Sequence, residues 1–291
     1  MNSLAITLVL CSALCHVFRD FFTKQSNDKQ LFVWWMSFIS NLVVLPFALW
    51  FAMTGPTISW LGFFFSLGMG MVHASYWTLY SKAYEGADIS HVYPIIRSAP
   101  ALVLLLAVVF LKESVSIIGL LGILMVTFGL YTINLKGYSL KHLFEPFRAA
   151  SYDKHVKIAF LAMIAVATYS TLDKVAVSMV HPIVYMYVMV SSGMVFYTIG
   201  MRRMKHRPDW NYPLKHNLKR LLWATLFGTL NYPLILFAIQ FTNVSYVAAF
   251  RQISVVFMVL AGAFLLKESY PLIRFVSSII IFAGALMIAF A

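Results

Sequence analysis

The chain contains little charge. Only 11% of its 291 residues are charged, whereas a soluble globular protein carries about 25%. Hydrophobic residues make up 61% of the chain, and the mean hydropathy is +0.82. This composition excludes an ordinary soluble domain and indicates that lipid surrounds most of the chain.

Several motifs of chemistry are also missing. The two cysteines, Cys11 and Cys15, lie four residues apart in an apolar run, so neither a disulfide framework nor a cysteine-based metal site is expected. No G-x-x-x-x-G-K-[ST] segment occurs, which excludes a nucleotide-driven pump built on this chain alone. Motifs of zinc proteases and serine hydrolases are absent as well. We therefore expect no cofactor, no metal and no enzyme.

What the chain does contain is long apolar runs. A helix needs about 20 residues to cross about 30 Å of hydrocarbon. Runs such as 101–111 are apolar at both odd and even positions, which is typical of helices and not of alternating barrel strands. The sequence predicts an all-α integral membrane protein with ten transmembrane helices. These are expected near 3–23, 31–53, 58–83, 89–111, 115–134, 156–178, 181–201, 220–241, 245–266 and 270–290.

The basic residues are distributed unevenly among the connections. Seventeen lysines and arginines fall after the odd-numbered helices, and only Lys112 and Lys174 fall after the even-numbered ones. Positive residues stay on the cytoplasmic side, so both termini are expected outside the cytoplasm of a plasma (inner) membrane. The two long connections, 134–155 and 201–220, are predicted to be cytoplasmic loops. The net charge of +12 is then a topology signal: we expect contact with membrane lipid and none with nucleic acid.

The two halves of the chain are similar. Residues 87–114 resemble residues 242–269 at a constant offset of 155, and both segments end in the letters LKES. Five helices per half would invert the second copy in the membrane, an arrangement typical of secondary transporters. We expect a first repeat at 1–137, a cytoplasmic linker at 138–155 and a second repeat at 156–291.

The two LKES turns are expected to be structural. Glu113 and Glu268 each precede a new helix, where a negative charge and a serine cap are favourable.

The segments YPIIR and AAFRQISVVF open the fourth and ninth predicted helices. Together with the repeat and the two LKES turns, they make the chain similar to the drug/metabolite transporter superfamily, in its EamA type. The resemblance covers nearly the whole chain. It implies a ten-helix transporter whose central cavity is lined by both halves, and it implies no particular substrate.

Arg97 is the first candidate for binding a substrate. It lies about 12 Å along the fourth helix from Ile89, and an arginine inside a membrane is costly. Its forked donors fit a carboxylate or phosphate, and Tyr93 shares its helix face. The alternative is a side chain that extends to the cytoplasmic surface. Pro94 and Pro100 are expected to bend this helix.

Arg251 is the second candidate. It lies six residues into the ninth helix, and the strict repeat alignment puts Gln252 opposite Arg97. Since the two arginines enter from opposite sides, they could hold one anion between the halves. The alternative is an ion pair between Arg251 and Asp173.

Titratable residues on the first and sixth helices are candidates for coupling transport to protons. His16 and Asp20 are four residues apart, as are Tyr169 and Asp173, so each pair shares a helix face. Histidine titrates near neutral pH. The alternative for Asp20 is a local pair with Arg19.

A polar and aromatic wall is expected from the third and eighth helices. His73 and Tyr76 share one face, and Asn231 lies at a similar depth in the second half. Such groups can line a site for a small organic ligand, although most aromatic residues here are expected in the core or at the membrane interface.

The sequence therefore predicts a secondary transporter that moves a small anionic or zwitterionic metabolite by alternating access. One alternative is an exporter of cationic or aromatic compounds, with Asp20 or Asp173 as counter-ion. A second is an intramembrane lipid-modifying enzyme using His16 and Asp20 as acid and base. A third is a membrane partner that transports nothing. The direction, the coupling ion and the choice between monomer and homodimer stay open.

Overall fold

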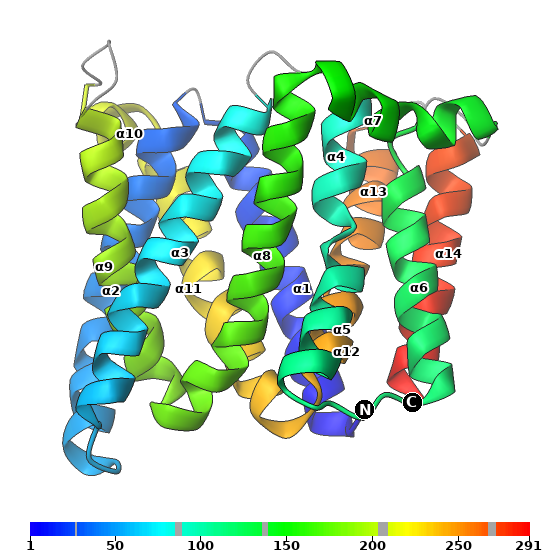
Figure 1. Cartoon of the computed structure of the whole chain (residues 1–291). Helices are drawn as coiled ribbons and strands as arrows, with labels where there is room; N and C mark the ends of the chain where they lie inside the picture. The colour runs from blue at the N-terminus through cyan, green and yellow to red at the C-terminus, as the bar shows by residue number, and fades with distance from the viewer. Residues whose placement is uncertain (27, 85–88, 136–138, 203–208, 267–271) are drawn as a thin grey trace.

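The structure is a computed structural model that describes residues 1–291 except 27, 85–88, 136–138, 203–208 and 267–271. Its described residues form helices joined by short connections, and they contain no strand. The long helices run side by side (Figure 1). The helices are α1 (Ser3–Lys24), α2 (Lys29–Thr54), α3 (Trp60–Tyr84), α4 (Ile89–Arg97), α5 (Ala99–Phe110), α6 (Ile117–Thr132), α7 (Leu140–Tyr152), α8 (Lys154–Met179), α9 (Pro182–Arg202), α10 (Tyr212–His216), α11 (Leu218–Phe241), α12 (Val244–Phe250), α13 (Ile253–Leu266) and α14 (Leu272–Ala289).

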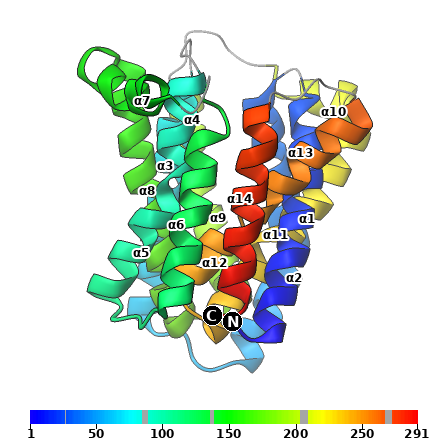
Figure 2. The same cartoon turned by 90° about the vertical axis from the view of Figure 1, so that its right-hand side faces the viewer.

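Within the described residues the chain passes ten times through the bundle, because α4 with α5 and α12 with α13 each form one pass. Seven passes are long and apolar enough to cross a membrane by length and composition, and α6 and Val244–Leu260 are shorter apolar helices. This confirms the prediction of an all-helical membrane protein. Both termini lie at one end of the bundle (Figures 1 and 2), where the Met1 amino group donates to the Ala289 carbonyl at 3.2 Å.

The predicted loops are partly helical, so that expectation was wrong. Connection 134–155 contains α7, and connection 201–220 contains the short α10. α7 begins after Ser139, whose side chain caps its first turn, and it packs on α4 and α8. The sequence did not indicate this helix because α7 is too short and too polar to read as a membrane-crossing segment: three of its 13 residues are charged.

Two of the passes are broken at nearly the same place in each repeat. α4 ends at Arg97, and α5 starts after Ser98, whose Oγ donates to the Pro94 carbonyl at 2.7 Å. The second break falls between α12 and α13, at Arg251 and Gln252, one to two residues before the position that an offset of 155 gives for Ser98. The prolines of the first half are not repeated in the second. The shared break is therefore a property of the fold and not of proline alone.

The packing of the helices follows the inverted repeat. α1 packs on α11, and its counterpart α8 packs on α3. α3 packs on α9 and α11 on α2, which again are counterparts, while α2–α9 and α6–α14 pair each helix with its own counterpart. The helices of the two halves thus interlock instead of forming two separate bundles.

Glycines allow one of these crossings to be very close. A Cβ atom on Gly129 would lie 2.6 Å from Ile281 Cγ1, and one on Gly284, its counterpart, would lie 2.7 Å from the Gly122 carbonyl oxygen. Both distances are shorter than any side chain tolerates, so only glycine permits α6 and α14 to pack backbone to backbone.

Glu113 does not cap the helix that follows it, which corrects the expectation for the first LKES turn. Ser116 caps α6. Glu113 instead accepts hydrogen bonds from the Val244 amide at 2.6 Å and from Ser245 Oγ at 2.7 Å, both at the start of α12. Since the free amides of a helix start favour a negative charge, Glu113 ties the first half to the second. Glu268 lies outside the described residues.

Candidate functional site

Asp173 lies in the middle of a buried carboxylate cluster, defined here as Asp173, His73, Tyr185 and Tyr232. The side chain of Asp173 is only 5% exposed. Tyr232 donates to its Oδ2 at 2.5 Å, Tyr185 donates to its Oδ1, and His73 Nε2 lies 3.4 Å from Oδ1. These residues come from α8, α3, α9 and α11, so the cluster joins both halves of the molecule.

The contacts indicate how the protons are arranged. A tyrosine hydroxyl that donates to Asp173 can still accept, and Tyr232 Oη lies 3.3 Å from His73 Nε2. These contacts fit the tautomer of His73 that is protonated on Nε2, because an N–H there would face both oxygen atoms.

Aromatic rings extend this cluster along α3. The Tyr169 ring lies 4.1 Å from the His73 ring and 5.3 Å from the Tyr76 ring, measured between centroids. Tyr80 follows at 5.7 Å from Tyr76. Three predicted site residues (His73, Tyr76 and Tyr169) are thus brought together with Asp173.

Arg97 has few partners. Its Nη1 donates to Gln252 Oε1 at 3.4 Å, a long hydrogen bond, and its guanidinium carbon lies 5.2 Å from the centre of the Tyr93 ring. Since Gln252 is the repeat counterpart of Arg97, the two broken helices meet at this pair. Among the described residues, no carboxylate lies within 4 Å of Arg97.

Arg251 lies at the end of α12, where its amide bonds to the Val247 carbonyl at 3.0 Å. Its guanidinium makes no ion pair with a described residue. The alternative interpretation of an ion pair with Asp173 is not found, because the partners of Asp173 are His73 and the two tyrosines. Arg97 and Arg251 are both only partly buried.

The polar residues of α1 form a local triad. Arg19 donates to Asp20 at 2.7 Å and to His16 Nδ1 at 2.9 Å. His16 Nε2 lies 3.3 Å from Asp20 Oδ2. Because a guanidinium only donates, Arg19 keeps His16 Nδ1 unprotonated in this arrangement.

The side-chain oxygen of Asn231 does not face the carboxylate cluster. Its Oδ1 accepts from Ser12 Oγ at 2.6 Å, so the residue links α11 to α1. Its neighbour Tyr232 is the one that reaches Asp173. The sequence pattern did not indicate Tyr185, which reaches Asp173 because the chain reverses direction between α8 and α9, at Val180 and His181.

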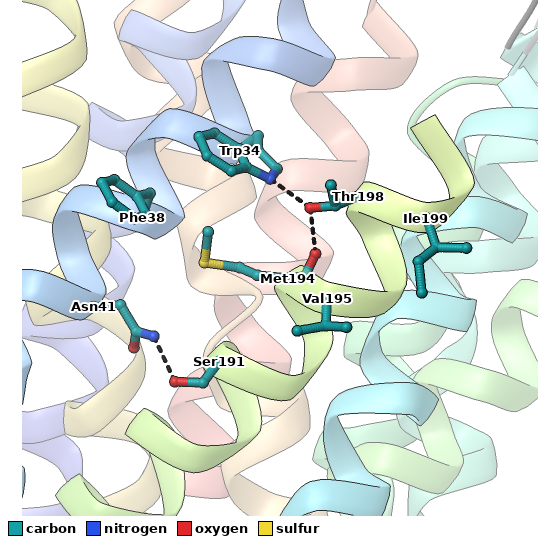
Figure 3. A pocket seen from close by; sticks show the side chains of 8 residues that line it. All are labelled: Trp34, Phe38, Asn41, Ser191, Met194, Val195, Thr198 and Ile199. Carbon is teal, nitrogen blue, oxygen red and sulfur yellow. Dashed lines mark hydrogen bonds between the residues drawn. The ribbon is translucent and has the colours of Figure 1, made fainter. Parts of the chain in front are cut away.

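Two grooves lie away from these residues. The larger has a volume of about 430 Å³ and runs between α2 and α9 (Figure 3), where Trp34 Nε1 donates to Thr198 Oγ1 and Asn41 Nδ2 donates to Ser191 Oγ. The other, of about 370 Å³, lies between α3 and α9. Neither is lined by Arg97, Arg251 or Asp173. The described residues contain no group of three histidines, cysteines or carboxylates that could hold a metal ion.

Ten helical passes, two interlocked repeats, broken helices and charged residues at the breaks define a membrane transporter. The EamA-like transporter family matches residues 3–135 and 154–290. The chain therefore belongs to the EamA-like transporter family, as the resemblance implied, and is a multi-pass membrane protein that handles a small molecule.

The fold is also known from solved structures. One, described only as "Crystal structure of protein", is similar with a TM-score of 0.70 at 13% identity, over 99% of this chain and 96% of the other. At this identity the likeness shows the fold alone. No curated protein matches the chain.

Proposed function

We propose that the protein is a secondary transporter for a small anionic or zwitterionic metabolite, and that Arg97 binds its acidic group. One observation carries the proposal. Arg97 lies at the break of a membrane-crossing pass, and among the described residues it has no acidic partner. An unpaired arginine at such a position is costly unless a ligand or water uses its donors.

The surroundings of Arg97 favour binding over extension to the surface. An arginine that extends to the membrane surface directs its guanidinium to water, whereas Arg97 contacts Gln252 of the other half. Tyr93 lies beneath the guanidinium and leaves its other donors available for a carboxylate or phosphate. Arg251, at the matching break, is the second group proposed to contact the anion. Tyr76, Tyr169 and Asn231 are proposed to complete the walls around it.

Alternating access fits the interlocked halves. A site at the point where counterpart helices meet can be exposed to either side when helices of the two repeats move against one another. Contacts that differ between the two states then determine the direction of coupling. Both the plasma-membrane location and termini outside the cytoplasm remain part of this proposal.

Coupling to protons is assigned to Asp173 with His73 in preference to His16 with Asp20. The first pair joins the two halves, so a proton bound there can affect how they move. The second pair lies on one helix, and Arg19 binds both of its members. The contacts with Arg19 weigh against His16 as a catalytic base and against Asp20 as the counter-ion of a cationic substrate. Asp173 is poorly placed for that role as well, because Tyr185, Tyr232 and His73 already occupy its oxygen atoms.

The test is thermal unfolding of the purified protein in detergent with matched anions, zwitterions and cations. A ligand at 100 times its Kd stabilises the folded state by about 2.7 kcal/mol. We expect a carboxylate or phosphate compound to raise the unfolding temperature of the wild type and not that of Arg97→Gln. Arg97→Lys, which keeps the charge without the fork, should retain part of the effect.

Arg220→Gln is the matched control, because Arg220 is exposed on α11 and should not alter the response. Stabilisation by amines that survives in Arg97→Gln would contradict the proposal and favour the cation exporter. A compound that passes this test can then be followed in liposomes, where flux separates a transporter from a membrane protein that only binds.

A further inference from the structure

α7 lies across the end of the bundle opposite the termini (Figures 1 and 2). This is the end that carries most of the basic connections and that the positive-inside rule predicts to be cytoplasmic. Three of the 13 residues of α7 are charged, a larger share than in the helices that cross the bundle. Its length and position fit a helix that lies along a membrane surface and does not cross it.

Large aromatic side chains are exposed on α7. Phe144 is 54% exposed, Phe147 is 53% exposed and Tyr152 is 72% exposed. At 100° per residue, Phe144 and Phe147 lie within one broad face of the helix, and the exposed Lys141 and Arg148 lie on the same face. Aromatic and basic residues mixed on one face are typical of helices that bind the head-group region of a membrane.

The rest of α7 is held firmly by the bundle. The Tyr131 hydroxyl donates to the Leu143 carbonyl at 2.5 Å. Phe147, on the exposed face, packs one side of its ring on Tyr131 at 5.9 Å between ring centroids and leaves about half of its surface exposed. Glu145 faces α4, where His91 Nε2 lies 3.3 Å from its Oε1. These contacts fix which face of α7 is exposed, so the exposed face is not the product of an unattached linker.

We propose that α7 is an interfacial helix that binds anionic phospholipid head groups. Lys141 and Arg148 contact the phosphates, and Phe144 and Phe147 enter the boundary between the head groups and the acyl chains. Charge complementarity selects this occupant, because the cytoplasmic leaflet carries negative lipids that attract basic residues close to it. The aromatic residues add the apolar contact that a soluble nucleotide or acidic peptide would not require.

The test uses the full-length protein in detergent and measures how tightly it retains added phosphatidylglycerol or phosphatidylcholine by native mass spectrometry. The wild type should prefer phosphatidylglycerol. The double variant Lys141→Gln with Arg148→Gln should lose about 25-fold of that affinity, because each basic residue near a membrane surface contributes roughly a fivefold effect. Its affinity for phosphatidylcholine should change little.

Lys215→Gln with Lys219→Gln is the matched control. It makes the same change in net charge at exposed positions of α10 and α11, and it should retain phosphatidylglycerol within about twofold. An equal loss in both double variants would show a general effect of net charge and overturn the proposal. So would an unchanged affinity in the α7 variant, the result expected if this face binds a protein instead. All four positions are exposed, so unfolding temperatures should match the wild type.

Discussion

The carboxylate cluster and the Arg97 site lie in the same bundle but differ in how fully their charged groups are paired. Asp173 accepts from two tyrosines and faces His73, and its side chain is 5% exposed. Arg97 has one hydrogen bond at 3.4 Å and no acidic partner among the described residues. A buried charge with all its partners in place stabilises the fold and orders its neighbours. A charge without them is available to a ligand.

This difference assigns separate roles to the two sites. The carboxylate cluster connects four helices from both halves, so it is suited to holding the halves together and to passing the effect of a proton between them. The arginine site lies at the broken helices, where the regular helical hydrogen bonds of the backbone are interrupted. Such a break between two helices is suited to recognising a substrate. If the two sites were one, a single substitution would remove both proton coupling and substrate binding.

The largest effect is expected from giving Arg97 a permanent partner. In Gln252→Glu a carboxylate would lie where Oε1 now stands 3.4 Å from Arg97 Nη1, and it would form a charge-assisted bond that competes with any anion. We expect stabilisation by anions to fall by a factor of about 100 in affinity, measured as the concentration needed for a given rise in unfolding temperature.

Gln252→Met is the control for this prediction, because it removes the same hydrogen bond without adding charge and should still bind anions. The unfolding temperature of Gln252→Glu without ligand should equal or exceed that of the wild type, since its new ion pair compensates an unpaired charge. Anion binding that persists unchanged in Gln252→Glu would remove Arg97 as the binding group.

A smaller effect, of a different kind, is expected at the carboxylate cluster. Tyr232→Phe and Tyr185→Phe each remove one donor to Asp173 and keep the ring. Each should lower the free energy of unfolding by about 1–2 kcal/mol. This lies between the contribution of a typical hydrogen bond inside a membrane protein and that of a hydrogen bond to a charged group. Denaturant unfolding in detergent measures this loss.

Anion binding should survive in both tyrosine variants, with affinities within about threefold of the wild type. Tyr187→Phe is a suitable control, because Tyr187 lies on the same helix and its hydroxyl has no hydrogen bond to the cluster. A tyrosine variant that keeps its stability but loses anion binding would mean that the two sites are one.

Much of the fold could be predicted from the sequence because the membrane imposes simple requirements. Helices must be long and apolar to cross it, and the offset of 155 between the halves placed Gln252 opposite Arg97, where the structure brings them into contact. α7 could not be predicted this way, because it does not cross the membrane. It packs against α4 and α8, contacts that the sequence pattern does not show.

The partners of the charged residues were harder to predict than their positions. Tyr185 and Glu113 make their contacts with groups that are distant in the sequence or on another helix, namely Asp173 across a turn and the start of α12 in the other half. Periodicity shows which residues share one helix face and says nothing about the neighbouring helix. His16, Arg19 and Asp20, which contact one another along a single helix, were the group that spacing described best.

The smallest effect is expected in that α1 group, where charges are paired but lie on one helix and are partly exposed. The side chain of Asp20 is 33% exposed and its partners are Arg19 and His16. Such pairs contribute about 0–1 kcal/mol, and Arg19 would keep His16 as a partner in Asp20→Asn. We expect the free energy of unfolding to change by less than about 1 kcal/mol, measured by the same denaturant experiment. A loss of transport in liposomes by Asp20→Asn, with flux retained in Asp173→Asn, would move the coupling role from the cluster that joins the halves to the triad within one helix.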